Sequence, residues 1–173
     1  MTNFKETLRN VKAFIFDVDG VFTDGTVYLD PSGEMVRSMN IKDGYAVQYC
    51  IKKGYPVGII SGGNSESVRE RFRRLGITDI YLKSHNKMDD FEDFMYKYSL
   101  MAEQILYMGD DIPDHQIMSR VGVPTCPSDA VQEIKKLSTY ISDKKGGQGC
   151  VRDVVEQVMK LHGTWMSEEA FQW

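Results

Sequence analysis

The sequence predicts an α/β domain in which helices cover both faces of a doubly wound, mainly parallel sheet of the Rossmann-like kind. Three short apolar runs have the length of buried strands: Ala13–Phe16, Val57–Ile60 and Ile105–Met108. Amphipathic helical patterns separate these runs, and this alternation of strand and helix is typical of a parallel sheet. The length of 173 residues and the hydrophobic content of 42% fit one domain with an ordinary core.

The other elements follow from the same patterns in chain order. Weaker strand-like runs occur at Ile80–Leu82, Val123–Thr125 and Thr139–Ile141. The spacing of apolar residues predicts helices around Val68–Leu75, Met88–Tyr98, Val131–Leu137 and Val151–Val158. We expect Gly76 to end the first of these helices and Ser128 to cap the third.

One segment interrupts the alternation directly after the first strand. Thr26–Asp30 and Met35–Met39 have the pattern of two strands, and the turn Asp30-Pro31-Ser32-Gly33 between them suits type I geometry. The sequence therefore predicts an inserted β-hairpin over about residues 26–40. Because an isolated hairpin is marginally stable in water, we expect it to pack on something, and a neighbouring subunit is one candidate.

These elements leave room for a single domain over residues 1–173 and for no separate cap domain. Its core is expected to span about residues 11–160. The tail, residues 161–173, carries Trp165, Phe171 and Trp173 without a clear period, so it is either frayed or docked.

Composition excludes several classes of protein. The net charge of −4 argues against a nucleic-acid binder. No apolar run approaches the ~20 residues of a membrane span, and the first ten residues lack the apolar segment of a signal peptide. The widely spaced Cys50, Cys126 and Cys150 indicate reduced thiols, so we expect a cytoplasmic protein without membrane or nucleic-acid partners.

Polar residues follow each of the three strong strands. Asp17 comes after the first strand, Ser61 after the second, and Gly109-Asp110 after the third. Because ligands bind beyond the carboxyl ends of the strands in open α/β sheets, we expect these side chains to converge.

The same loops carry further carboxylates. Asp19 follows Asp17 by two residues, and Asp111 and Asp114 follow Asp110. Carboxylates gathered at one point repel one another unless a cation is present. A few carboxylates with water and a phosphate are the usual ligands of Mg²⁺, so the sequence predicts a magnesium site.

The remaining motif residues suit an anion. Ser61 is followed by Gly62 and Gly63 at the expected start of a helix, where backbone N–H groups favour phosphate. Lys87 at the start of the next helix supplies a positive charge. A carboxylate, a divalent cation, a hydroxyl and a lysine together indicate phosphoryl transfer through an aspartyl-phosphate.

These motifs resemble those of the haloacid dehalogenase superfamily. The matching residues are Asp17-Val18-Asp19-Gly20-Val21, Ser61, Lys87 and Gly109-Asp110-Asp111-Ile112-Pro113-Asp114. The resemblance covers residues from about 11 to 160. Within the superfamily the chain is similar to a capless subgroup, through Thr23-Asp24-Gly25, Lys42-Asp43-Gly44 and the glycine-rich run at residues 145–152.

The resemblance implies a role for each catalytic residue. Asp17 would attack the phosphorus, and Asp19 would protonate the leaving sugar oxygen and then activate water. Ser61 and Lys87 would hold the phosphoryl oxygens.

It also implies the ligands of the metal. Asp17, Asp110 and the backbone carbonyl of Asp19 would bind Mg²⁺. Asp111 and Asp114 would be outer or backup ligands.

The resemblance implies a sugar-acid phosphate as substrate, with 3-deoxy-D-manno-octulosonate (KDO) 8-phosphate favoured and lipopolysaccharide synthesis as the pathway. Gly63 favours this substrate over 2-keto-3-deoxynononate (KDN) 9-phosphate, because the enzymes for the latter carry an acidic residue there. Further candidate substrate-binding residues are Gly62, Thr26, Arg71 and Arg74; the two arginines share a helix face and suit a carboxylate. The implied assembly is a homotetramer in which a neighbour completes each open site.

Three alternatives stay open at this point. One is a KDN 9-phosphate phosphatase or a promiscuous sugar phosphatase. Another is a receiver-like signalling module phosphorylated on Asp17, although an acid/base at Asp19 serves turnover rather than storage of the phosphoryl group. The third is a catalytically silent scaffold, which the intact motifs disfavour.

Overall fold

The structure, a computed structural model, describes residues 4–172 and confirms the predicted parallel sheet. Six strands lie in the order β5-β4-β1-β6-β7-β8, and every neighbouring pair is parallel. They are β1 (Ala13–Phe16), β4 (Val57–Ile60), β5 (Asp79–Tyr81), β6 (Ile105–Met108), β7 (Val123–Cys126) and β8 (Tyr140–Ile141). The three strong apolar runs have the predicted bounds, and the weaker ones differ by one residue at one or both ends.

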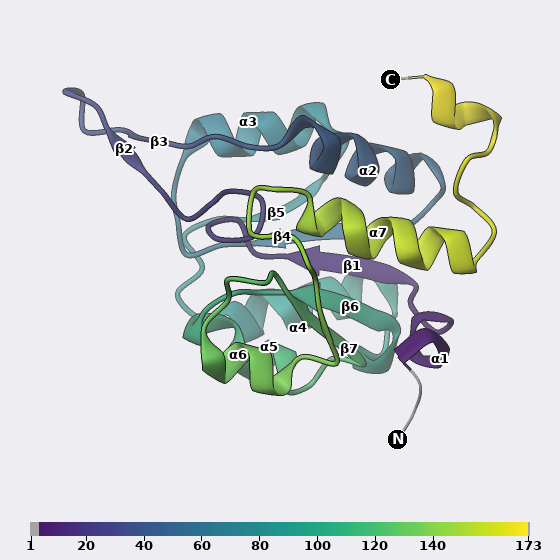
Figure 1. Cartoon of the computed structure of the whole chain (residues 1–173). Helices are drawn as coiled ribbons and strands as arrows, with labels where there is room; N and C mark the ends of the chain where they lie inside the picture. The colour runs from purple at the N-terminus through teal and green to yellow at the C-terminus, as the bar shows by residue number, and fades with distance from the viewer. Residues whose placement is uncertain (1–3, 173) are drawn as a thin grey trace.

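Helices cover both faces of this sheet (Figure 1). One face carries α2 (Ile41–Lys52), α3 (Glu66–Arg74) and α7 (Cys150–Leu161), and the other carries α4 (Lys87–Tyr98), α5 (His115–Met118) and α6 (Gln132–Leu137). Phe14 and Phe16 of β1 pack into the first core, whereas Ala13 and Ile15 pack into the second. Both faces of β1 are buried because side chains alternate along a strand and each face meets helices.

The remaining elements are short. They are α1 (Phe4–Leu8) and the 3₁₀ turns η1 (Ala102–Gln104), η2 (Ile112–Asp114) and η3 (Glu168–Phe171). Within the described part of the chain, no helix has the length and apolar character to cross a membrane.

The connections of β1 position the site. From β1 the chain passes to β4 on one side, and it later returns to β6 on the other side. The loops that follow β1, β4 and β6 therefore leave the same edge of the sheet next to one another, at the point where strand order reverses.

The predicted cap at Ser128 is wrong. Helix α6 begins at Gln132 with Val131 as its N-cap, and no side chain caps it. The Ser128 N–H donates instead to the Lys144 carbonyl at 2.9 Å. This contact with a loop remote in sequence determines the position of Ser128, which local pattern could not show.

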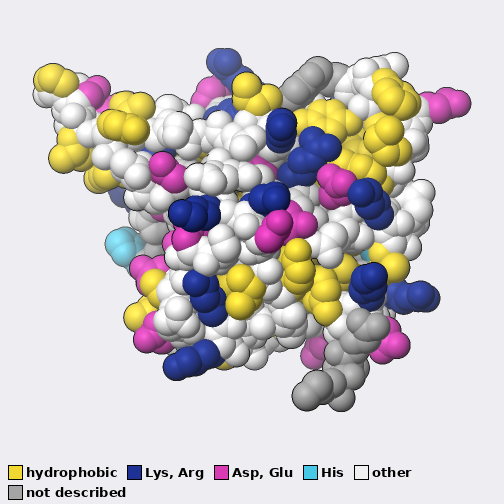
Figure 2. Space-filling model, viewed as in Figure 1, with side chains coloured by type: hydrophobic (Ala, Val, Ile, Leu, Met, Phe, Trp, Pro, Cys, Tyr) yellow, Lys and Arg dark blue, Asp and Glu magenta, His cyan; other side chains and the backbone are white. Residues whose placement is uncertain are grey.

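The predicted hairpin is present and projects from the body of the molecule (Figure 1). Its strands, β2 (Tyr28–Leu29) and β3 (Met35–Val36), are shorter than predicted. The Gly33 N–H donates to the Asp30 carbonyl at 3.0 Å, which closes the predicted turn. Figure 2 shows apolar side chains gathered on this projection, and Leu29 is 77% exposed. Packing on a neighbouring subunit remains a prediction.

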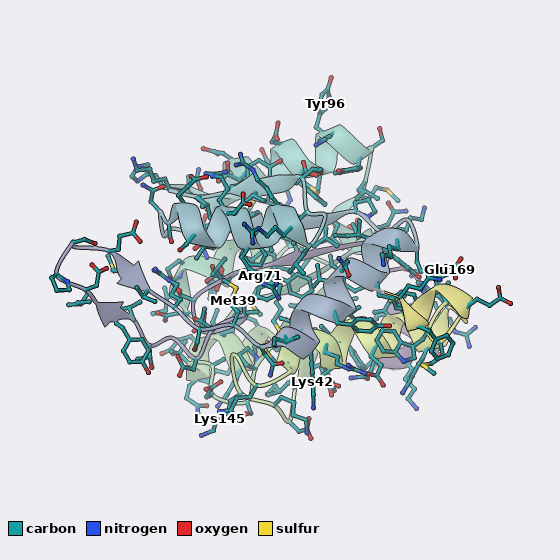
Figure 3. All side chains as sticks on the ribbon, turned by 90° about the horizontal axis from the view of Figure 1, so that it is seen from above. Met39, Lys42, Arg71, Tyr96, Lys145 and Glu169 are labelled. Atoms are coloured by element: carbon teal, nitrogen blue, oxygen red, sulfur yellow. The ribbon has the colours of Figure 1, made fainter. Side chains whose placement is uncertain are left out.

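The tail docks on its own chain as far as it is described; Trp173 lies outside the described residues. Tyr49 of α2 donates its hydroxyl to the Thr164 carbonyl at 3.0 Å and lies edge-on to Trp165. Lys53 pairs with Glu169 at 2.7 Å. These contacts place the tail over α2, and Glu169 lies at the far end of the molecule from the hairpin in Figure 3.

Candidate active site

A cavity of about 840 Å³ opens beyond the carboxyl ends of β1, β4 and β6. The loops after these strands supply most of its polar lining, as the strand order predicts. The predicted site residues that line it are Asp17, Asp19, Ser61, Gly62, Gly63, Lys87, Asp110 and Asp111.

Lys87 joins two carboxylates at the floor of the cavity. Its Nζ lies 3.0 Å from Asp17 Oδ2 and donates to Asp114 Oδ1 at 2.8 Å. Asn86 caps α4 by accepting the Met88 N–H, so Lys87 is the first residue of the helix, as predicted. Burial lowers the pKa of Lys87, but the charges of Asp17 and Asp114 outweigh burial and raise it. The lysine is therefore a permanent cation beside Asp17.

Asp114 is fully buried, and hydrogen bonds use both of its oxygens. Its Oδ1 accepts from Lys87 and from the Tyr107 hydroxyl at 2.6 Å. Its Oδ2 accepts the Asp110 N–H at 3.1 Å. Oxygens of Asp17, Asp110 and Asp114 lie within 4.8 Å of one another, but those of Asp114 already accept hydrogen bonds from Lys87, Tyr107 and the Asp110 N–H.

Asp17 and Asp110 have the properties of cation ligands. Burial, followed by repulsion from Asp114, raises the pKa of Asp17 to about 8 and that of Asp110 to about 7. Asp110 Oδ1 is buried and has no hydrogen-bond partner among the described residues. A Cβ at Gly20 would lie 1.9 Å from Asp110 Oδ2, so only glycine lets the Asp17–Gly20 loop approach this carboxylate. The orphaned oxygen and the two crowded carboxylates fit a hard divalent cation such as Mg²⁺.

The anion side of the cavity differs from the prediction. Helix α3 begins at Glu66 with Ser65 as its N-cap, so Gly62 and Gly63 lie in a loop before the helix, not at its start. The Ser84 N–H donates to the Ser61 carbonyl at 3.0 Å, and this bond ties the loop after β4 to the loop after β5. Ser84 is among the residues that line the cavity, but its hydroxyl is buried and has no partner in the described structure. Ser61 Oγ accepts the Gly63 N–H at 3.2 Å and keeps its own O–H for a phosphoryl group.

Asp19 forms an ion pair that the sequence did not predict. Arg37, which follows β3 of the hairpin, donates from Nε to Asp19 Oδ1 at 2.6 Å and from Nη2 to Asp19 Oδ2 at 3.0 Å. The Arg37 side chain is 8% exposed, and that of Asp19 is 37% exposed. The hairpin therefore reaches the site through this arginine.

The three remaining candidates for substrate binding, Arg71, Arg74 and Thr26, lie outside the main cavity of the described chain. Arg71 lines a second hollow with Arg37 and Met39, and Figure 3 shows Arg71 beside Met39. Arg74 pairs with Glu70 at 2.9 Å on the exposed side of α3. Thr26 is exposed and donates its N–H to Asp24. Within one chain, none of the three joins the lining of the main cavity.

Sequence reasoning missed Arg37, Ser84 and Tyr107. Ser84 had a weak signal, because it follows a strand just as Ser61 does. Arg37 and Tyr107 had none, since one lies in an irregular stretch after the hairpin and the other inside a buried strand.

The parallel sheet and the acidic site beside a buried lysine define a phosphohydrolase of the haloacid dehalogenase class. A family model of haloacid dehalogenase-like hydrolases matches residues 72–152. A 3-deoxy-D-manno-octulosonate 8-phosphate phosphatase (KdsC) from Escherichia coli is 33% identical over 155 residues, covering 90% of this chain and 82% of that protein. The chain belongs to this phosphatase family within the haloacid dehalogenase-like hydrolases.

Solved structures agree with this assignment. The phosphatase of the same name from Yersinia pestis has a TM-score of 0.91 and 30% identity, covering 93% of this chain and 87% of that chain. The one from Moraxella catarrhalis, a complex with magnesium, phosphate and KDO, has a TM-score of 0.92 and 27% identity over 99% of both chains.

Proposed function

We propose that this enzyme hydrolyses KDO 8-phosphate to KDO and phosphate, with Mg²⁺ as cofactor. The observation that carries the proposal is the buried pair of Asp17 and Lys87 beside the unpartnered oxygen of Asp110. Phosphoryl transfer needs a nucleophilic carboxylate, a cation held beside it, and a carboxylate oxygen that is free to bind a metal ion. The similarity to KDO 8-phosphate phosphatases over most of both chains supports the substrate.

Asp17 is the proposed nucleophile. Its Oδ1 accepts the Val18 N–H at 2.7 Å and its Oδ2 contacts Lys87, so the carboxylate is held in one orientation. One of its oxygens forms a bond to phosphorus while the bond from phosphorus to the sugar oxygen breaks. Ser61 and Lys87 hold the phosphoryl oxygens.

Asp19 is the proposed acid and base. It gives a proton to the departing sugar oxygen, and it then takes a proton from the water that attacks the aspartyl-phosphate. Phosphate leaves, and both carboxylates return to their starting states. The proposed metal ligands are Asp17, Asp110 and the Asp19 carbonyl. Bound Mg²⁺ supplies charge neutralisation between the carboxylates and the phosphoryl group.

We also propose that the enzyme works as a cytoplasmic homotetramer. Val27, Tyr28, Leu29, Met35 and Val36 of the hairpin are all exposed apolar residues, which a second copy would cover. Arg71, Arg74 and Thr26 would then serve a site only from a neighbouring subunit. The three cysteines are free and buried, as expected in a reducing compartment.

Phosphate release with Mg²⁺ tests the function. We would compare kcat/KM for KDO 8-phosphate, KDN 9-phosphate and hexose phosphates. A clear preference for the first supports the proposal, whereas flat and weak activity on all three would remove the substrate and keep the chemistry. A stable phospho-Asp17 without phosphate release would favour the signalling alternative.

A further inference from the structure

Arg37 is a cation that the catalytic chemistry above does not use. It lines the second hollow and pairs with Asp19, which lines the main cavity. Its guanidinium has five N–H groups. Nε and Nη2 each donate one to Asp19, and Nη1 donates one to the Met35 carbonyl at 2.7 Å. One N–H on each terminal nitrogen is left over. A planar guanidinium can therefore hold Asp19 and still offer two donors to a second acceptor.

Gly63 keeps the space in front of these donors open. A Cβ built on Gly63 would lie 3.5 Å from Arg37 Nη2, 3.5 Å from Asp19 Oδ2 and 3.4 Å from Ser61 Oγ. Arg37 Nη2 and Ser61 Oγ are therefore within about 7 Å of one another, on either side of a position without a side chain. A small molecule held by its phosphate at Ser61 would pass this position before it reaches Arg37.

The negative charges around the cavity explain why a further cation is needed to bind an acidic substrate. Asp17, Asp19, Asp110 and Asp111 line the cavity, and Lys87 is already shared between Asp17 and Asp114. A substrate with a second anionic group, away from its phosphate, meets repulsion from the carboxylates unless another cation is near. Among the described residues, two arginines line the neighbouring second hollow, Arg37 and Arg71, and of these Arg37 pairs with Asp19 and so lies against the main cavity with donors to spare.

We propose that Arg37 binds the carboxylate of the sugar-acid substrate through its two unused N–H groups while it holds Asp19. The hairpin segment thereby contributes a specificity-determining residue to the site of its own chain. The same guanidinium would contact both the substrate carboxylate and Asp19, the proposed acid/base. This inference rests on the proposed function and identifies the contact that selects an acidic sugar over a neutral one.

The test compares two substrates that differ in the carboxylate. KDO 8-phosphate and ribose 5-phosphate both release a primary alcohol and need the same acid, but only the first carries a carboxylate. For Arg37→Met we expect kcat/KM for KDO 8-phosphate to fall about 10- to 100-fold more than for ribose 5-phosphate. Arg37→Lys keeps the positive charge but lacks the paired N–H donors of the guanidinium, so it should recover part of the lost kcat/KM for KDO 8-phosphate. Arg73→Met, which removes an exposed arginine of α3 that pairs with Glu66, is the matched control.

A binding measurement separates substrate contact from effects on Asp19. Titration of KDO alone and of inorganic phosphate alone into the Mg²⁺-loaded protein needs no turnover. We expect Arg37→Met to weaken KDO binding at least tenfold and phosphate binding less than threefold.

Three outcomes would overturn the inference. Equal losses on both substrates, with unchanged KDO binding, would make Arg37 a positioning residue for Asp19 alone. Equal weakening of KDO and phosphate would indicate a general field effect. Wild-type kinetics in Arg37→Met would leave it no role. A wild-type protein that does not hydrolyse KDO 8-phosphate would instead refute the proposed function.

Discussion

Asp114 offers a sharp test of how the site is built, because its carboxylate oxygens either accept hydrogen bonds from protein groups or bind a metal ion. The structure gives Oδ1 to Lys87 at 2.8 Å and Tyr107 at 2.6 Å, and Oδ2 to the Asp110 N–H at 3.1 Å. The Asp114→Ala change leaves a buried lysine short of one counter-charge and a buried hydroxyl and N–H unpaired. Breaking a buried ion pair in this way costs about 3–5 kcal/mol.

This loss is large for a chain of 173 residues. It corresponds to a fall in Tm of roughly 6–20 °C. The Asp114→Asn change keeps the shape and one acceptor, so we expect a smaller loss of about 1–3 kcal/mol. Urea unfolding of metal-free protein measures both. Asp111→Asn is the control, because Asp111 is exposed and its side chain accepts backbone N–H groups, from Ile112 at 2.8 Å and from Asp114 in a capping box, which an Asn oxygen can also accept; its loss should be within about 1 kcal/mol.

A role of Asp114 chiefly as a metal ligand makes the opposite prediction. In that case Asp114→Asn would keep the wild-type urea midpoint and yet raise the Mg²⁺ concentration for half-maximal activity tenfold or more. That result would make Asp114 a ligand and would remove it as the support of Lys87.

Three further predictions concern the nucleophile, the cation and the tail. Asp17→Asn should abolish phosphate release while circular dichroism stays native, because the nucleophile is lost; release above about 1% of wild type would refute the assignment of Asp17. Burial raises the pKa of Asp17 to about 8 and that of Asp110 to about 7. Between about pH 4 and pH 8 the folded metal-free protein therefore holds more protons than the unfolded chain, so its free energy of unfolding falls as pH rises through that window. Mg²⁺ should therefore raise Tm more at pH 8 than at pH 5, and an equal rise at both would contradict this account. Trp165→Ala removes the contacts of the tail with Tyr49 and with the Arg152 guanidinium, which lies 5.5 Å from the indole. It should cost about 1–2 kcal/mol in urea unfolding and leave kcat/KM within twofold; a tenfold loss of kcat/KM without a loss of stability would place the tail at an active site.

The elements that the sequence predicts well are those whose signal is local. β1, β4 and β6 were predicted with their bounds because each is a fully buried apolar run that a polar residue or glycine follows. Lys87 lies at a helix start, as predicted, and the structure shows that Asn86 caps α4 directly before it. Helix α3 begins later than predicted, because the loop before it pairs with the loop after β5: the Lys83 N–H donates to the Gly63 carbonyl at 3.0 Å.

The sequence by itself determined the sheet, the hairpin and the acidic edge where Asp17, Ser61 and Asp110 meet, because strand-end residues of a parallel sheet gather at one edge whatever the loops do. Only the tertiary structure decided what Asp114 and Arg37 contact. Asp114 turns inward to Tyr107 and Lys87, and Arg37 reaches Asp19 across the 18 positions that include the hairpin. No periodicity encodes these pairings, because they depend on the path of irregular backbone and on where a buried charge finds its partner.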